Sequence, residues 1–305
     1  MKKIFSVLLI MLMILGFSGN EAAAEKEIAV LTPYLESVTT NTLVRTFESE
    51  AEGMGWNVTI SDTRGDYEAL AGRFDDAVSR EVDAIVMGMG NTRQISSEIE
   101  AAAEAGIPVF GGDVEYIEPL EVNVTSNNFV LGSQSTSYLF NHIMEGEVVK
   151  LYHSAHPGVH RREIIFDAMA DFYEDIEVVD EHFVEVPGPI EDAQNAVQSI
   201  LLSHPDIDGI WAAWDEPAIG AALAVMEAGM ADQVSIVGSD GNEQALDMIA
   251  DGGPLKATVA QDFEKMAEIL VDEMDRYFAG EGVSERIIYA PTDLVTPENV
   301  EEFLE

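Results

Sequence analysis

Two apolar runs in this chain end in side chains that could hold a small polar ligand. The run Ile210–Ala213 is followed directly by Trp214 and Asp215, and the run Val234–Gly238 is followed closely by Asp240. The face of an indole ring covers the carbon surface of a sugar ring, while a carboxylate accepts strong hydrogen bonds from the hydroxyl groups at the rim. These residue types, at the ends of strands in an α/β pattern, indicate a binding site for a small ligand.

Each of these residues also has a structural alternative. Asp240 could cap the helix expected after it, and Asp215 could cap the helix that contains Pro217. Trp214 could fill a core, as we expect of Trp211 inside the strand. We expect Trp214 to contact the ligand, and for Asp240 both possibilities stay open on the residues alone. For Asp215 capping is favoured, and ligand contact stays open.

Three histidines in one predicted loop could hold a metal ion. His153, His156 and His160 lie close together, and imidazole is a common zinc ligand. The chain has no cysteine to complete such a site, and the cations Arg161 and Arg162 follow directly. We therefore expect this loop to line a cleft and to donate hydrogen bonds to ligand oxygens, with no structural metal.

Neither a cofactor nor catalysis is predicted. The run Gly88–Arg93 could cradle a phosphate, but Arg93 replaces the third glycine of a dinucleotide motif. No serine, histidine and aspartate have the spacing of a nucleophile elbow. We expect a binding protein rather than an enzyme, and the alternative of the other class is an exported hydrolase of small glycosides.

The elements that must position these residues alternate along the chain. Short β-rich runs alternate with helix-length stretches, a pattern that predicts parallel sheets covered by helices. About ten strands are more than one domain of this kind usually holds, so we expect an α/β protein with two doubly wound sheets. Helices are expected at 38–54, 67–80, 93–105, 129–145, 162–173, 191–203, 218–228 and 262–279, with the last strand at 286–291.

The charge of the chain is strongly negative. It has 57 acidic and 15 basic residues, a net charge of −42, and the acids are spread through every predicted helix. Such a surface repels nucleic acid and anionic membranes. Molar salt screens repulsion to within about 3 Å, so the acidic coat indicates a protein from a salt-rich environment. The alternative is an exported protein that is merely acidic.

The first 24 residues differ from the rest. Lys2 and Lys3 precede an apolar run that ends at Phe17, and Ala22–Ala24 offer a small-residue cleavage site. This pattern is typical of a secretory signal peptide and is too short for a comfortable membrane span. We expect an exported protein without disulfides or a cysteine-linked lipid, and an uncleaved signal is the remaining route to a membrane anchor.

The corners after the later strands resemble those of a known family. The segments His204–Gly229 and Ile236–Ala267, with Asp240 in a Val-Gly-Ser-Asp-Gly corner and Gln261 at the end of Thr-Val-Ala-Gln, resemble the ribose- and galactose-type periplasmic binding proteins of ABC importers. The resemblance covers essentially the whole chain after residue 24. Regulators of the lac-repressor type share this fold, but the signal peptide in place of a DNA-binding helix-turn-helix favours transport.

The resemblance implies the arrangement of type I periplasmic binding proteins. Two Rossmann-like lobes with parallel sheets are joined by three crossings and close on a sugar at the hinge. The expected N-terminal lobe comprises residues 25–128 and 261–288, and the C-terminal lobe comprises residues 129–260 and 289–305. The crossings are expected near Asn127, Gln261 and Tyr289.

The resemblance also implies roles for individual residues. Asp240 matches the family aspartate that accepts hydrogen bonds from sugar hydroxyls, and Gln261 matches a glutamine at a hinge crossing. Trp214 falls where the family usually has an asparagine. Other positions near family site residues are Arg161 or Arg162, Asp113, and Ser37, Thr39 and Thr40 on the first loop. Family members carry stacking phenylalanines on that loop, so its aromatic platform is not expected here.

The expected function is therefore that of an exported, monomeric solute-binding protein. It would capture a sugar or a sugar-like polyol and deliver it to the membrane permease of an ABC importer, with no cofactor and no nucleic acid. The alternative among binding proteins is a non-sugar ligand, such as a furanone-type signal or a nucleoside, suggested by the missing aromatic rings of the first loop.

Overall fold

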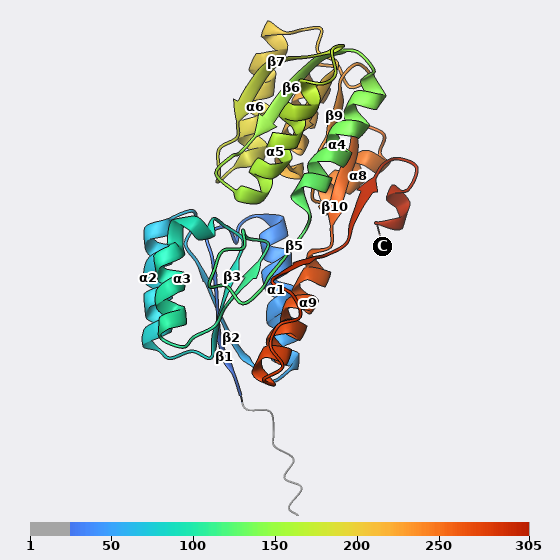
Figure 1. Cartoon of the computed structure of the whole chain (residues 1–305). Helices are drawn as coiled ribbons and strands as arrows, with labels where there is room; N and C mark the ends of the chain where they lie inside the picture. The colour runs from blue at the N-terminus through green and yellow to red at the C-terminus, as the bar shows by residue number, and fades with distance from the viewer. Residues whose placement is uncertain (1–24, 305) are drawn as a thin grey trace, which may run out of the picture.

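The computed structural model describes residues 25–304 and shows two α/β lobes, each built on a six-stranded sheet (Figure 1). The predicted fold class is confirmed. The predicted signal peptide lies outside the described residues. Within residues 25–304 no helix is long and apolar enough to cross a membrane.

The N-terminal lobe has an entirely parallel sheet with the spatial order β11-β5-β4-β3-β1-β2. Its strands are β1 (Glu27–Thr32), β2 (Asn57–Asp62), β3 (Ala84–Gly88), β4 (Val109–Gly112), β5 (Asn123–Thr125) and β11 (Ile287–Tyr289). The central strands β1, β3 and β4 are almost fully buried, as expected for a sheet covered on both faces.

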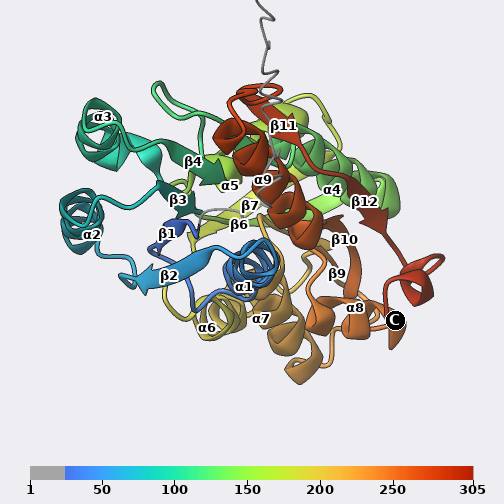
Figure 2. The same ribbon diagram turned by 90° about the horizontal axis from the view of Figure 1, so that it is seen from below.

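Helices cover both faces of this sheet. On one face lie α1 (Val38–Gly53) and α9 (Phe263–Phe278), and on the other lie α2 (Tyr67–Ser79) and α3 (Ser96–Glu104), which follows the short 3-10 helix η1 (Thr92–Ile95) (Figure 2). In α1 the residues at helical spacing, among them Leu43, Phe47 and Ala51, are buried against the sheet.

The C-terminal lobe has the order β12-β10-β9-β8-β6-β7. Its strands are β6 (Gly146–Tyr152), β7 (Ile176–Phe183), β8 (Gly209–Ala212), β9 (Ser235–Val237), β10 (Leu255–Gln261) and the antiparallel β12 (Thr292–Val295). Its helices are α4 (Asn128–Ile143), α5 (Pro157–Ala170), α6 (Pro189–Ser203), α7 (Asp215–Glu227), α8 (Glu243–Ala250) and the 3-10 helix η2 (Val300–Glu302). Trp211 is fully buried, which confirms its expected place in the core; it stacks on Phe166 at 4.6 Å between ring centroids.

The chain passes from one sheet to the other at three places. These lie between β5 and α4, between β10 and α9, and between β11 and β12. Gln261 ends β10 in the C-terminal sheet, and Tyr289 ends β11 in the N-terminal sheet. Gln261 therefore lies in the C-terminal lobe, although the sequence placed it in the N-terminal one. Tyr289 lies in the N-terminal lobe, although the sequence placed it in the C-terminal one. We propose lobe boundaries at Asp262 and at Ala290 instead.

Two elements differ from the predicted ones. The helix expected from Arg162 begins at Pro157, because His156 accepts a hydrogen bond from Val159 N and a proline fits the first helical turn. The strand expected at 286–291 is β11, and a further strand that was not predicted, β12 (Thr292–Val295), follows it in the other sheet. The chain turns from one lobe to the other between them.

Candidate functional site

A cavity of about 490 Å³ lies between the lobes, at the carboxyl ends of strands from both sheets. Its buried polar members include Asp113, Arg162, Asp240 and Gln261, and its exposed edge includes Glu36, Arg64 and the connection between β7 and α6. Eight of the ten residues proposed from the sequence line this cavity: Ser37, Thr39, Thr40, Asp113, Arg162, Trp214, Asp240 and Gln261.

The inner end of the cavity is a network around Asp240. The Arg162 guanidinium donates to Asp240 Oδ1 over 3.1 Å, and the Gln261 amide donates to the same oxygen over 2.6 Å. Arg162 is itself held by Asn128 Oδ1 at 2.7 Å and by the carbonyl oxygen of Ala213 at 2.9 Å. The guanidinium therefore has a fixed position beside the carboxylate.

Burial changes the acidity of this network. Removal from water raises the pKa of Asp240 to about 7, and the Arg162 cation offsets part of that rise. Asp240 can thus change its charge near neutral pH, although it forms an ion pair. When it is ionised, its Oδ2 offers a charged acceptor to a ligand hydroxyl.

Two further polar atoms at the cavity are buried without a hydrogen-bond partner. Gln261 Oε1 and His156 Nε2 both lack one. Burial lowers the pKa of His156 to about 4, so its imidazole is neutral at neutral pH. His156 Nδ1 accepts from the backbone N–H of Val159 at 3.4 Å, which leaves the ring proton on Nε2. The site therefore offers one acceptor and one donor, each of which a polyol hydroxyl can satisfy.

Four lining residues have a strained backbone, among them Arg64 with a φ angle of 52°. Met89, Asp113 and Asp240 have φ angles of 57°, 52° and 137°, a region that favours glycine. They follow β3, β4 and β9, so each strand turns sharply where it meets the cavity. Such strain is typical of residues held in place for function. Asp113 is further fixed by the Thr125 hydroxyl, which donates to it over 2.6 Å.

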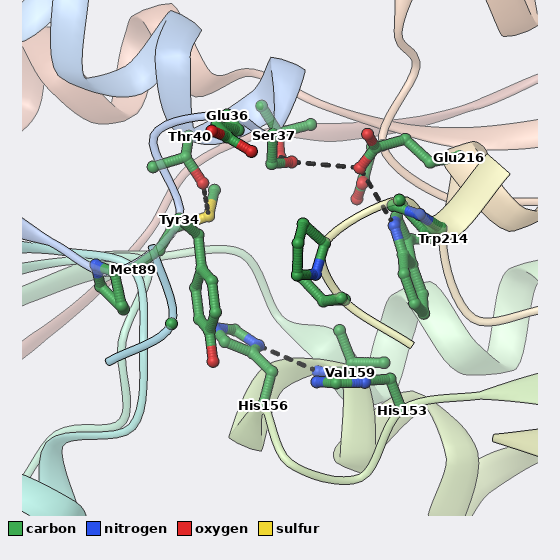
Figure 3. A pocket seen from close by; sticks show the side chains of 18 of the residues that line it. Tyr34, Glu36, Ser37, Thr40, Met89, His153, His156, Val159, Trp214 and Glu216 are labelled. Carbon is green, nitrogen blue, oxygen red and sulfur yellow. Dashed lines mark hydrogen bonds between the residues drawn. The ribbon is translucent and has the colours of Figure 1, made fainter. Parts of the chain in front are cut away.

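Aromatic rings flank the cavity on opposite sides (Figure 3). Trp214 belongs to the C-terminal lobe, and its Nε1–H donates to Glu216 Oε2 at 3.2 Å. Tyr34 belongs to the N-terminal lobe, where its ring meets the edge of His156 at 6.4 Å between centroids. The expectation that the first loop lacks an aromatic ring at the cavity is wrong, because Tyr34 precedes the small polar residues on which that expectation rested.

The hydroxyl groups of the first loop are already engaged. Ser37 Oγ donates to Glu216 Oε2 over 3.2 Å and so joins the two lobes across the cavity (Figure 3). Thr39 Oγ1 lies 3.2 Å from Ser37 Oγ, and Thr40 Oγ1 donates to Met89 Sδ over 2.8 Å. Ser37 and Thr40 therefore stabilise the cavity wall in the described form.

Arg161 and Asp215 are absent from the cavity lining. Arg161 donates to Glu115 Oε1 at 3.1 Å, which forms an ion pair between the lobes, and Arg93 binds the same carboxylate. Asp215 is fully buried. It accepts hydrogen bonds from the backbone N–H groups of Gly241 and Asn242 at 2.7 and 2.9 Å. The expectation that Asp215 caps α7 is therefore wrong, because its carboxylate instead fixes the loop that carries Asp240.

Several lining residues were not proposed from the sequence. The connection Val186–Ile190 forms a wall of the cavity, and Met89, Phe263 and Glu216 also line it. The two prolines that flank Gly188 mark an ordered turn and could have drawn attention to this connection. Of the three histidines, His153 and His156 line the cavity. Between residues 25 and 304, no group of three or more His, Cys, Asp or Glu side chains could hold a metal ion.

The chain is similar to sugar-binding proteins of known sequence. It is 28% identical over 258 residues to the ribose import binding protein of Bacillus subtilis (strain 168), covering 83% of this chain and 82% of that protein. It is also 28% identical over 256 residues to the D-apiose import binding protein of Actinobacillus succinogenes, covering 82% and 81%.

Solved structures show the same fold. An ABC transporter solute binding protein from Agrobacterium vitis with bound allitol superposes with a TM-score of 0.86 at 25% identity, covering 91% of this chain and 97% of that one. A solute binding protein from Bacillus halodurans with bound myo-inositol gives 0.85 at 24% identity, covering 92% and 97%. The family described as periplasmic binding protein domain matches residues 28–282. That match spans most of the chain, which therefore belongs to the periplasmic binding protein family.

Proposed function

We propose that this protein captures a sugar or a sugar-like polyol between its lobes and delivers it to the permease of an ABC importer. One observation carries the proposal. The inner end of the cavity holds an ionisable carboxylate, Asp240, together with the buried, unpartnered Gln261 Oε1 and His156 Nε2. A molecule with several neighbouring hydroxyl groups can satisfy all three, because each hydroxyl both donates and accepts.

The relatives support this ligand class. The matched sequences are named for import of ribose and D-apiose, and the solved structures hold allitol and myo-inositol. All are polyols or sugars, so a furanone-type signal, a nucleoside or glycoside hydrolysis is not favoured. Substrate-binding proteins of transporters are not enzymes, and we propose the same for this chain. Export through the N-terminal signal, a monomeric state and a salt-rich habitat belong to the same proposal.

A ligand panel tests the proposal. Thermal unfolding and isothermal titration would be measured with D-ribose, D-apiose, D-allose, allitol and myo-inositol. We expect at least one to raise the melting temperature and to bind with one-to-one stoichiometry, because a ligand that binds only the folded state stabilises it. No binding by any sugar or polyol in a wider panel would refute the proposal.

A pair of variants locates the binding. Gln261→Met removes both the unpartnered acceptor and the amide that donates to Asp240, at nearly constant length, and we expect it to weaken the best ligand at least about tenfold. Gln244→Met makes the same change on the exposed surface of α8 and should bind as the wild type does. Equal affinity in both variants would place the ligand outside the cavity.

A further inference from the structure

The cavity has a second region that a bare sugar ring does not need. Its volume of about 490 Å³ would hold roughly sixteen water molecules at about 30 Å³ each. A single pentose or hexose displaces fewer. Polar atoms suited to hydroxyl groups gather at the inner end, on Asp113, Arg162, Asp240, Gln261 and His156. The rest of the space therefore lies towards the exposed edge.

Besides the polar side chains of Glu36, Arg64, Glu191 and Gln194, the cavity has one apolar wall at that edge. It is the connection Val186–Ile190, all five residues of which line the cavity. None of their side chains has a polar atom, and Pro187 and Pro189 have no backbone N–H to donate. Val186 is 40% exposed, so burial of its side chain under an apolar group of a ligand would be favourable. A sugar hydroxyl placed against this wall would lose water and find few donors.

The N-terminal lobe also presents carbon surface to this part of the cavity. Pro33 and the ring of Tyr34 line the cavity, and the Tyr34 hydroxyl lies 3.4 Å from that of Tyr67. The Trp214 N–H is likewise used by Glu216. Both aromatic residues therefore have their polar atoms engaged within the protein and can offer ring surface to a ligand (Figure 3).

We propose that the ligand is a sugar or polyol that carries an apolar substituent, such as an alkyl, alkylthio or aryl group. The hydroxylated ring binds at the inner end, and the substituent lies along Val186–Ile190, between Tyr34 and Trp214. This inference rests on the proposed function and narrows its ligand class.

The test compares each free sugar with its own substituted forms. The probes are D-ribose, D-allose and D-galactose, each free and as its methyl and n-butyl glycosides, together with 5-alkylthio derivatives of ribose. Each buried methylene contributes about fourfold in affinity, which corresponds to about 0.8 kcal/mol. We expect at least one n-butyl or alkylthio probe to bind ten or more times tighter than its free sugar in isothermal titration.

A matched pair of variants assigns the gain to the apolar wall. In Val186→Ser the ratio of substituted to free affinity should fall several-fold. In Val178→Ser, a similarly exposed valine on β7 away from the cavity, the ratio should stay as in the wild type. Free sugars that bind as tightly as all their substituted forms would overturn the inference and leave the proposed function standing. If neither free nor substituted sugars bind, both fail.

Discussion

Asp240 is the residue whose charge state the fold controls most directly. Its carboxylate is buried with Arg162 and Gln261, and burial raises its pKa from 3.8 to about 7. A pKa raised by folding means that the protonated form is favoured in the fold. The contribution of Asp240 to stability is therefore fully present below about pH 4 and is lost as the pH rises through 7. Ligand hydroxyls should lower the pKa of Asp240, because they donate hydrogen bonds to its ionised form.

We therefore expect ligand affinity to fall as the pH is lowered from 8 to 6. Binding lowers the pKa of Asp240, so at pH 7 it should release protons, which titrations in buffers of different ionisation enthalpy would detect. Asp240→Asn should bind more weakly, by about 2 kcal/mol for the loss of a charged hydrogen bond, and with little pH dependence. An affinity that is flat from pH 6 to 8 in the wild type would contradict this role.

Arg161 and Arg162 are neighbours with different partners. Arg162 is buried and holds Asp240, whereas Arg161 is partly exposed and reaches Glu115 of the other lobe. Arg162→Met should abolish measurable binding or unfold the protein, because it leaves a buried carboxylate without its cation. Arg161→Met should cost affinity fivefold or less, since ion pairs at the surface contribute about 1 kcal/mol or less.

Salt separates the two arginines further. The small effect of Arg161→Met should vanish in 1 M salt, where the Debye length is about 3 Å. The effect of Arg162→Met should persist, because the pair lies away from solvent. Equal losses in the two variants at every salt concentration would show that Arg161 also contacts the ligand.

At the scale of elements, closure of the lobes is visible around Trp214. The residue occupies the N-cap position of α7 without a side-chain cap, and it lies beside Glu216, whose side chain accepts from Ser37 of the other lobe. Burial raises the pKa of Glu216, consistent with a carboxyl group enclosed between the lobes. Trp56 and Trp211 are buried within their own lobes, with Trp56 packed edge-on against Phe278.

Trp214 should therefore report ligand binding. We expect tryptophan fluorescence to shift on titration and to saturate with the binding curve, because the ligand displaces water from the indole ring. Trp214→Phe should lose most of this change and retain a weakened affinity, while Trp56→Phe serves as the control. A full spectral change in Trp214→Phe would assign Trp214 to the structure alone.

Much of the fold and part of the candidate site could be predicted from local sequence patterns. Alternating strands and helices predict the two sheets, and the ends of β9 and β10 predict Asp240 and Gln261 at a common edge. The apolar wall Val186–Ile190 was not predicted, because it reaches the site only when two distant segments close on each other. The place of Tyr34 at the cavity was not predicted for a similar reason. Its ring is directed to the cavity by Tyr67 and His156, which lie far from it in the chain.

The positive φ angles of Met89, Asp113 and Asp240 were also beyond prediction from the sequence. Residues other than glycine adopt this region only where their surroundings enforce it. At Asp240 the enforcing contacts come from Asp215, which binds the next two backbone N–H groups. Asp215, which was expected to cap a helix, thus supports Asp240, the residue proposed to bind the ligand.

At the scale of the whole molecule, the net charge determines the salt concentration at which the fold is stable. Residues 1–24 carry two lysines and one glutamate, a net charge of +1, so their removal would leave −43 on the rest of the chain. Fewer than a third of the acids between residues 25 and 304 have a cationic partner, among them Asp83 with Lys26 and Glu181 with Lys150. The remaining carboxylates repel one another, and compaction brings them closer together.

Stability should therefore rise steeply with salt. We expect the urea midpoint of the chain lacking residues 1–24 to increase from dilute buffer to 2 M potassium chloride, because screening weakens repulsion more in the compact state than in the expanded one. A variant with the six exposed glutamates of α1, α3 and α9 changed to glutamine should need less salt for the same midpoint; they are Glu50 and Glu52 on α1, Glu100 and Glu104 on α3, and Glu264 and Glu268 on α9. Urea does not itself screen charge, so the comparison isolates the electrostatic effect. A midpoint that stays constant across this range, in both the parent and the neutralised variant, would show that the acidic surface has no part in stability and would remove the argument for a salt-rich habitat.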